Sequence, residues 1–97
     1  MSSLDQFMFF QNLFNGKIVI GKSSYKTYMK IAKLLNRIGI KIISDKTYFK
    51  EAYAFRVFSG HFRGISLFDA KCIVSITNGI SYKSKDFYKD LKRLIRK

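Results

Sequence analysis

The sequence predicts an α+β fold, because helical and strand-like patterns alternate along 97 residues, a length that makes one domain or at most two small lobes. Residues 1–60 are expected to form an N-terminal lobe of helix, strand, helix and hairpin. Residues 61–97 are expected to form a reduced, β-rich C-terminal lobe with a Ser/Thr loop and a basic terminal helix. The apolar fraction of 47% is ordinary for a folded domain, but the net charge of +13 is not. A compact body with this charge repels itself unless a negative partner lies against it.

The clearest helix is expected between Lys22 and Ile40. Ser24 stands where an N-cap is expected, and Gly39 stands at the C′ position that favours glycine. Apolar side chains recur with the period of one helix face at Tyr28, Ile31, Ala32, Leu35 and Ile38. This apolar face predicts that the helix packs against a sheet.

The other elements follow from shorter patterns, in which β-rich runs predict strands and i, i+3, i+4 spacing predicts helices. A polar Asp45-Lys46 link between two β-rich runs predicts a hairpin. The expected elements are a helix from Ser3 to Gly16, a strand at Lys17–Ile20, hairpin strands at Ile40–Ser44 and Thr47–Lys50, either a third strand or an extension of the second at Ala52–Phe58, a basic link at His61–Gly64, strands at Ile65–Phe68 and Lys71–Ile76, and a final helix capped by Ser84.

Basic side chains recur along the other side of the central helix. These residues are Lys22, Lys26, Lys30, Lys33 and Arg37. No acid stands four residues after any of them, so intrahelical pairs do not neutralise the stripe. A solvated helix face is the plain alternative, but the sequence favours contact with phosphates. Most aromatic residues are expected in the core, apart from Tyr25, Tyr82 and His61.

Short polar residues gather around a glycine in the segment Ser75–Ser81, which includes Ser75, Thr77, Asn78 and Gly79. A simple turn after a strand would explain the Asn-Gly pair. The functional alternative is a polar hook whose hydroxyls and amide reach the shallow minor groove of an RNA helix. The pattern does not decide between these two interpretations.

The sequence offers little for catalysis. The acidic residues are scattered, no Gly-rich phosphate loop or nucleophile motif is present, and one His with one Cys, Cys72, cannot build a zinc site. We therefore expect no enzyme, no metal, no cofactor and no small-molecule substrate. We also expect no membrane span, signal peptide or transit peptide.

The order of elements, together with two motifs, resembles small-subunit ribosomal protein eight, the universal S-eight family. The opening helix pattern D-x-L-t-x-I-r-N of that family appears in degraded form at Asp5–Asn12. Its P-S/Y-S-K and L-x-x-E-G-Y/F-I motifs correspond to Ser23–Lys26 and Leu35–Ile40, with their spacing kept. Its hallmark I-I/V-S-T-S-K-G-I/V-M-T/S corresponds to Ile73–Tyr82. The resemblance covers about residues 4–82.

Within the hallmark, Ser75, Gly79 and Ile80 match outright, and Thr77 supplies a hydroxyl for a hydroxyl. Ile76 and Asn78 depart from the pattern. Family members are longer, and a basic helix stands here in place of their closing G-G-E-x-L strand. The contacts made by the missing parts are therefore not implied for this chain.

The resemblance implies a structural, rRNA-binding constituent of the small ribosomal subunit that helps to organise the central domain of its rRNA. Its expected partners are that rRNA and neighbouring small-subunit ribosomal proteins. The implied RNA-binding residues are Lys22, Ser24, Lys26, Lys30, Lys33, Arg37, Ser75, Thr77, Asn78 and Gly79.

Richness in Phe and Tyr with no Pro or Trp fits the AT-rich codons of an organellar genome, so we expect a mitochondrial ribosomal protein. The alternative locations are another organelle and the cytoplasm. The alternative functions are a small non-ribosomal RNA- or DNA-binding module and a basic protein of membrane surfaces.

Overall fold

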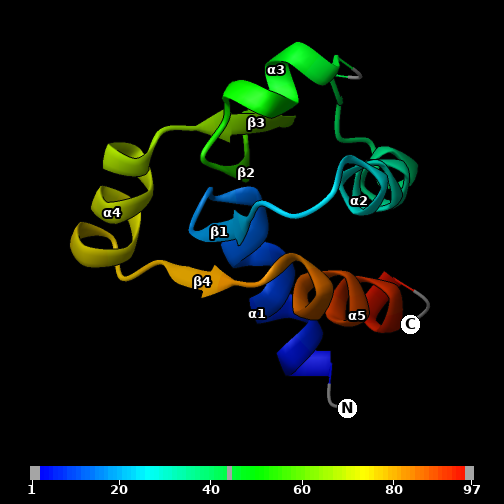
Figure 1. Cartoon of the computed structure of the whole chain (residues 1–97). Coiled ribbons are helices and arrows are strands. Elements are labelled where there is room, and N and C mark those ends of the chain that lie inside the picture. The colour runs from blue at the N-terminus through cyan, green and yellow to red at the C-terminus, as the bar shows by residue number, and fades with distance from the viewer. Residues whose placement is uncertain (1–2, 44, 96–97) are drawn as a thin grey trace.

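The computed structural model describes residues 3–43 and 45–95, and it is an α+β fold around one mixed sheet (Figure 1). The elements are α1 Ser3–Phe14, β1 Ile18–Gly21, α2 Tyr25–Arg37, α3 Lys46–Glu51, β2 Ala54–Phe58, β3 His61–Ile65, α4 Leu67–Ile76, β4 Ile80–Tyr82 and α5 Ser84–Ile95. The predicted α+β class is confirmed.

The four strands lie in the order β3-β2-β1-β4. Strand β1 is antiparallel to β2, with Ile20 opposite Phe55, and parallel to β4, with Val19 opposite Ser81. Strands β2 and β3 form an antiparallel hairpin. Residues from both ends of the chain therefore meet beside the central strand β1.

Side chains alternate between the two faces of this sheet, as the pleat requires. On one face Ile18, Ile20 and Phe55 belong to the main core, which α1, α2 and α5 also fill. On the other face Val19 and Ala54 belong to a smaller core with α4. Figure 1 shows α4 on one side of the sheet, away from α2 and α5.

The residues assigned to two lobes, 1–60 and 61–97, share one sheet and one main core. Phe62, Phe87 and Leu91 of the second range are buried in the same cluster as Leu13 and Leu35 of the first. The short strand β4 is paired with β1 rather than with β3, its predecessor in the chain. The last third of the chain therefore completes the core of the first two thirds.

The predicted limits of α2 are confirmed. The Ser24 hydroxyl accepts a hydrogen bond from the Thr27 amide at 3.1 Å, as an N-cap does. Gly39 has φ +90°, the left-handed conformation expected at C′. The Ile40 amide then donates to the Leu35 carbonyl at 3.1 Å, which closes the end of the helix.

The predicted hairpin at Ile40–Ser44 and Thr47–Lys50 is wrong in its described part, and Ser44 lies outside the described residues. Residues 46–51 form helix α3 instead. Its start is set by Asp45, whose carboxylate accepts from the Thr47 amide at 2.8 Å. Lys41 forms an isolated parallel bridge with His61 rather than part of a strand.

The predictions between residues 61 and 76 are also corrected. The expected basic link at 61–64 is strand β3, which follows a tight turn with Ser59 and Gly60 at φ +52° and +75°. Of the expected strands at 65–68 and 71–76, only Ile65 is in a strand, β3. Helix α4 forms instead from Leu67, and its N-cap Ser66 accepts from the Asp69 amide at 3.1 Å. A short apolar run does not distinguish a strand from a helix by periodicity alone.

Candidate nucleic-acid interface

Helix α2 presents its predicted basic stripe to solvent. Lys26, Lys30, Lys33 and Arg37 are all exposed, while Tyr28, Ile31, Ala32 and Leu35 are buried on the opposite side of the helix. None of the four basic residues forms an ion pair with another described residue. Their charge is therefore left for a partner or for solvent.

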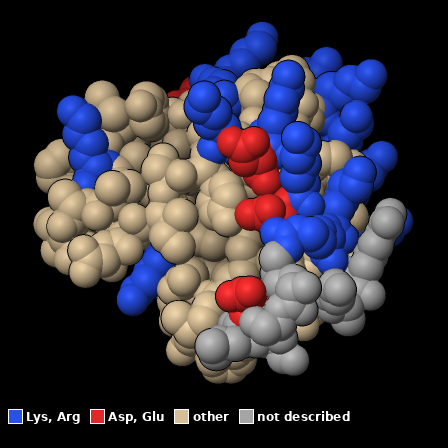
Figure 2. Space-filling view, turned by 90° about the horizontal axis from the view of Figure 1, so that it is seen from below, with Lys and Arg blue, Asp and Glu red and all other residues tan. Residues whose placement is uncertain are grey.

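Helix α5 lies beside α2 and extends this surface (Figure 1). It buries Phe87, Leu91 and Leu94 and exposes basic residues on its outer side. We call the combined region the basic surface, and its residues are Lys26, Lys30, Lys33, Arg37, Lys85, Lys89, Lys92 and Arg93. Figure 2 shows Lys and Arg gathered over the half of the molecule where α2 and α5 lie, and a mostly uncharged opposite half.

Acidic neighbours reduce the charge of α5 in part. The Asp90 carboxylate accepts hydrogen bonds from Arg93 at 2.9 Å and from the Tyr82 hydroxyl at 2.8 Å. Burial raises the pKa of Asp90, but these two hydrogen bonds outweigh it, so the pKa lies below its usual value. Burial, with Asp90 as the second cause, raises the pKa of Tyr82 to about 12. The Tyr82–Asp90 contact therefore ties β4 to α5.

A groove of about 680 Å³ lies where α2 and α5 begin. It is lined by Lys22 and Ser23 from the β1–α2 loop and by Lys83 to Asp86 from the start of α5. Strands β1 and β4 are parallel neighbours, so both lead into their helices at the same edge of the sheet. The free amides of two helix starts and several Lys side chains give this edge a positive potential.

Two predicted RNA-binding residues at this edge are already engaged within the protein. The Lys22 ammonium donates to the carbonyls of Lys50 at 2.7 Å and Ala52 at 3.1 Å, and it lies 4.9 Å from the centre of the Phe49 ring. The Ser24 hydroxyl both caps α2 and donates to the Thr27 hydroxyl at 3.1 Å. Lys22 therefore closes the end of α3, which no local sequence pattern indicates.

The Ser/Thr segment lies at the end of α4 rather than in a loop after a strand. The Ser75 hydroxyl donates to the Lys71 carbonyl at 2.7 Å, and the Thr77 hydroxyl donates to the Ile73 carbonyl at 2.6 Å. Asn78 follows with φ +55°, the left-handed conformation that ends many helices. Ser75, Thr77 and Asn78 are exposed, but both hydroxyl hydrogens are used within α4.

Gly79 is explained by packing. A Cβ atom at this position would lie 2.7 Å from the Ile73 side chain and 2.8 Å from the Lys17 carbonyl oxygen. The next amide, that of Ile80, donates to the same Lys17 carbonyl at 2.7 Å and begins the pairing of β4 with β1. The glycine therefore lets the chain pass from α4 into the sheet.

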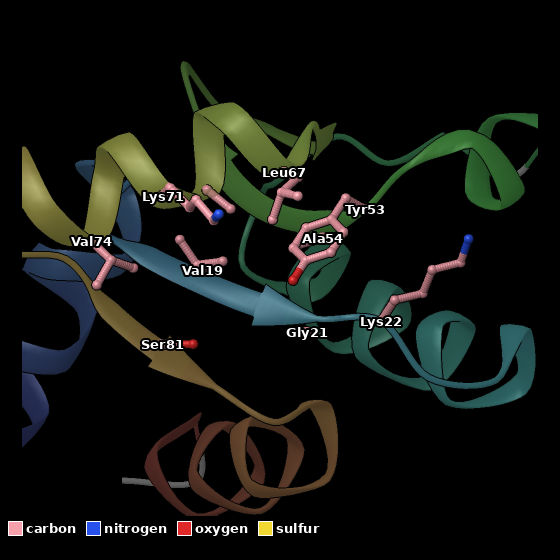
Figure 3. A pocket seen from close by; sticks show the side chains of 10 residues that line it. Val19, Gly21, Lys22, Tyr53, Ala54, Leu67, Lys71, Val74 and Ser81 are labelled. Carbon is pink, nitrogen blue, oxygen red and sulfur yellow. The ribbon is translucent and has the colours of Figure 1, made fainter.

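The structure separates the two predicted groups of RNA-binding residues. The stripe lies on α2, which packs on the main-core face of the sheet, and the segment Ser75–Gly79 lies at the end of α4 on the other face. A second groove, of about 460 Å³, lies beside α4 and is lined by Val19, Leu67, Val74 and Tyr53. Figure 3 shows Lys22 at its rim with its side chain extending away from the groove.

This second groove is lined by apolar side chains together with Lys71, Ser81, the Tyr53 hydroxyl and, at its rim, Lys22. Within residues 3–43 and 45–95, no cluster of three or more His, Cys, Asp or Glu side chains is placed to hold a metal ion. None of the helices in those ranges is both long and apolar enough to cross a bilayer. Comparison of the chain with protein families, with curated proteins and with solved structures found no match.

Proposed function

We propose that this chain is a structural RNA-binding protein of the small ribosomal subunit, related to small-subunit ribosomal protein eight. The observation that carries the proposal is the basic surface. Two adjacent helices expose cationic side chains on the same half of the molecule, and the α2 stripe makes no internal ion pair. Backbone phosphates are the partners that such a surface fits best, because they are closely spaced and do not require a concave pocket.

The dimensions of the stripe fit a polynucleotide backbone rather than a single small anion. Lys26 and Arg37 are eleven residues apart in a continuous helix, which is roughly 16 Å at the usual helical rise. Lys30 and Lys33 lie between them on the same side. The groove at the starts of α2 and α5 adds Lys83 and further positive potential at one end.

The family proposal rests on the resemblance in sequence and on two positions whose roles in the fold suit its motifs. Ser24 caps α2 where the P-S/Y-S-K motif opens a helix, and Gly39 adopts φ +90° where the L-x-x-E-G motif has its glycine. In the hallmark segment, Ser75 and Thr77 keep oxygen lone pairs that can accept from 2′-hydroxyls. The proposal includes the rRNA central domain, neighbouring ribosomal proteins and a mitochondrial location.

A small non-ribosomal RNA- or DNA-binding module is the second candidate, since phosphate contacts carry no sequence information. Binding to rRNA fragments separates the two. The ribosomal proposal predicts that the protein binds a central-domain fragment of small-subunit rRNA at least tenfold more tightly than an unrelated structured RNA of equal length, at one fixed salt concentration. Equal affinity for the two RNAs would favour the non-ribosomal module.

A matched pair of variants shows whether the basic surface is responsible. Lys33→Gln removes one exposed charge from α2, and Lys71→Gln removes one exposed charge from α4. We expect Lys33→Gln to weaken binding to the rRNA fragment several-fold and Lys71→Gln to have a much smaller effect. Equal losses would mean that net charge, and not this surface, governs binding. If anionic vesicles displace the rRNA fragment from the protein as effectively as competing RNA does, the result would point to a membrane-surface protein instead.

A further inference from the structure

A second cationic site lies on the other face of the sheet, beyond the part that α4 covers. Arg56 of β2 stands directly opposite Arg63 of β3, and Phe58 stands opposite His61 two residues further along the ladder. All four belong to the same face as Ala54, which packs under α4, because alternate residues of a strand share a face. We call these four residues the strand cluster.

The two arginines are an unfavourable pair unless an anion joins them. Like charges that face each other across an antiparallel ladder repel, since their Cβ atoms are about 5 Å apart. Neither arginine forms an ion pair with another described residue. The Nε atom of Arg56 is buried and donates to no atom of the described residues. The strand register therefore sets two arginines opposite each other, and no acid of the described residues neutralises either one.

The strand cluster also has a prepared flat surface. The Arg56 guanidinium carbon lies 4.4 Å from the centre of the Phe58 ring. Phe58 is 40% exposed although it is a large apolar side chain in a strand. Both side chains pack against Gly16, where a Cβ atom would lie 2.8 Å from the Phe58 ring and 3.2 Å from Arg56 Nη1. The glycine at φ +75° thus leaves room for the stacked pair.

The other two members border this flat surface. Arg63 is exposed, and its guanidinium is not held by a described acid. The His61 ring is half-buried, with Nδ1 2.9 Å from the Ser59 carbonyl oxygen. Because a carbonyl oxygen can only accept, Nδ1 carries the proton in this arrangement. His61 pairs with Phe58 across the ladder and therefore shares its face of the sheet with the two arginines.

We propose that the strand cluster binds an unpaired nucleotide of RNA. The base stacks on the exposed part of Phe58 and the Arg56 plane, and the adjoining phosphate lies against Arg63. Aromatic rings and guanidinium planes stack with unpaired bases of any sequence, whereas paired bases do not offer their faces. An acidic peptide would satisfy the arginines but would leave the exposed Phe58 ring without a partner.

This site goes beyond the proposed function, because it needs neither a ribosome nor the basic surface. The basic surface belongs to helices that cover the main-core face, while the strand cluster lies on the face of Val19 and Ala54. An RNA that reached both sites would have to pass around the edge of the sheet. The strand cluster can therefore be measured separately, with short RNA probes.

The experiment compares an unpaired oligouridylate with a perfectly paired RNA duplex of similar charge, each titrated with the full chain. Phe58→Leu keeps an apolar side chain against Gly16 and removes the ring. We expect it to weaken binding of the single strand roughly fivefold or more, as the loss of one stacking contact does. The affinity for the duplex should stay within twofold. Lys71→Gln, on the helix beside the cluster, should leave the preference for the single strand unchanged.

Two further variants keep the test decisive if Phe58→Leu lowers stability. Arg63→Gln changes an exposed residue, and it should weaken single-strand binding and reduce the slope of log K against log salt by about 0.7. Arg56→Lys keeps the charge but removes the planar group, so it should weaken the single strand more than the duplex. Circular dichroism melting shows that each variant is folded.

Equal losses on both probes, or unchanged single-strand affinity in Phe58→Leu and Arg56→Lys, would overturn the proposal. Tighter binding of oligoglutamate than of oligouridylate would also overturn it and would assign the cluster to an acidic protein. If the parent protein shows no preference for the rRNA fragment, yet these variants still lose single-strand binding, only the ribosomal proposal is contradicted. The proposal for the strand cluster then stands.

Discussion

At the scale of single residues, Lys22 shows how a basic side chain can serve the fold. Its ammonium group bonds to two carbonyls at the end of α3 and lies over the Phe49 ring. Lys26 is as exposed and belongs to the same basic run in the sequence, yet it makes no ion pair with a described residue. We infer that the first residue positions the β1–α2 loop and that the second is available to phosphates.

Lys22→Gln and Lys26→Gln test this distinction with the same change of charge. Lys22→Gln should lower the free energy of unfolding by about 1 kcal/mol, the usual scale for hydrogen bonds that a charged donor loses at an exposed site. For a domain of this size that is a fall of about 4–8 °C in the melting temperature. Lys26→Gln should change the melting temperature little and weaken RNA binding more. Equal melting temperatures for the two variants would contradict the structural role of Lys22.

The residue scale also limits what the sequence reveals about binding. The stripe on α2 was predictable because its period is that of the helix, so one pattern places Lys30, Lys33 and Arg37 together. The strand cluster was not, because it depends on the register of β2 against β3, which sets Arg56 opposite Arg63. No local sequence pattern gives that register. Moreover, residues 61–64 of β3 were predicted to form a link and not a strand.

At the scale of elements, the sequence predicted helices α1, α2 and α5 but not helices α3 and α4. Helices α2 and α5 bury one stripe and expose charges, and both were expected from their spacing. Helix α4 buries Ala70 and Ile73 but leaves Leu67, Phe68 and Ile76 exposed, so apolar residues surround it and hide its period. Its pattern resembles a pair of strands because tertiary packing, rather than amphipathicity, defines its buried side.

Strand β4 and helix α5 are joined by the hydrogen bond from Tyr82 to Asp90, which predicts a dependence of stability on alkaline pH. Burial and Asp90 raise the pKa of Tyr82 to about 12, whereas an unfolded tyrosine has a pKa near 10. Between these values the folded state keeps a proton that the unfolded state loses. The contribution of Tyr82 is therefore complete below about pH 10 and is lost as the pH rises towards 12.

Urea unfolding between about pH 9 and pH 11.5 measures this effect. Tyr82→Phe should be less stable than the parent protein at pH 9, because it loses the bond to Asp90, and its stability should fall less as the pH rises. Asp90→Asn keeps the tyrosine but removes a charge that raises its pKa, so the loss of stability should still begin near pH 10 but should be smaller and end at a lower pH. A Tyr82→Phe variant with the full pH dependence of the parent would contradict the assignment.

At the scale of the whole molecule, the basic surface and the exposed apolar residues of α4 lie on different sides of the sheet. The basic surface covers α2 and α5, and the exposed apolar residues of α4 lie on the other side of the sheet (Figures 1 and 2). Eight of the 19 Lys and Arg residues of the chain belong to the basic surface. An RNA-binding protein with neighbours in an assembly is expected to have this division, with phosphates on one side and another surface left for other contacts.

The salt dependence of RNA binding tests the central claim, that the stripe on α2 contacts phosphates. The parent protein and a variant with Lys26, Lys30, Lys33 and Arg37 all replaced by Gln are titrated with the same structured rRNA fragment at several salt concentrations. Each lost phosphate contact should make the slope of log K against log salt shallower by about 1, so we expect a total change of roughly 3–4. A folded variant whose slope equals that of the parent would contradict the account.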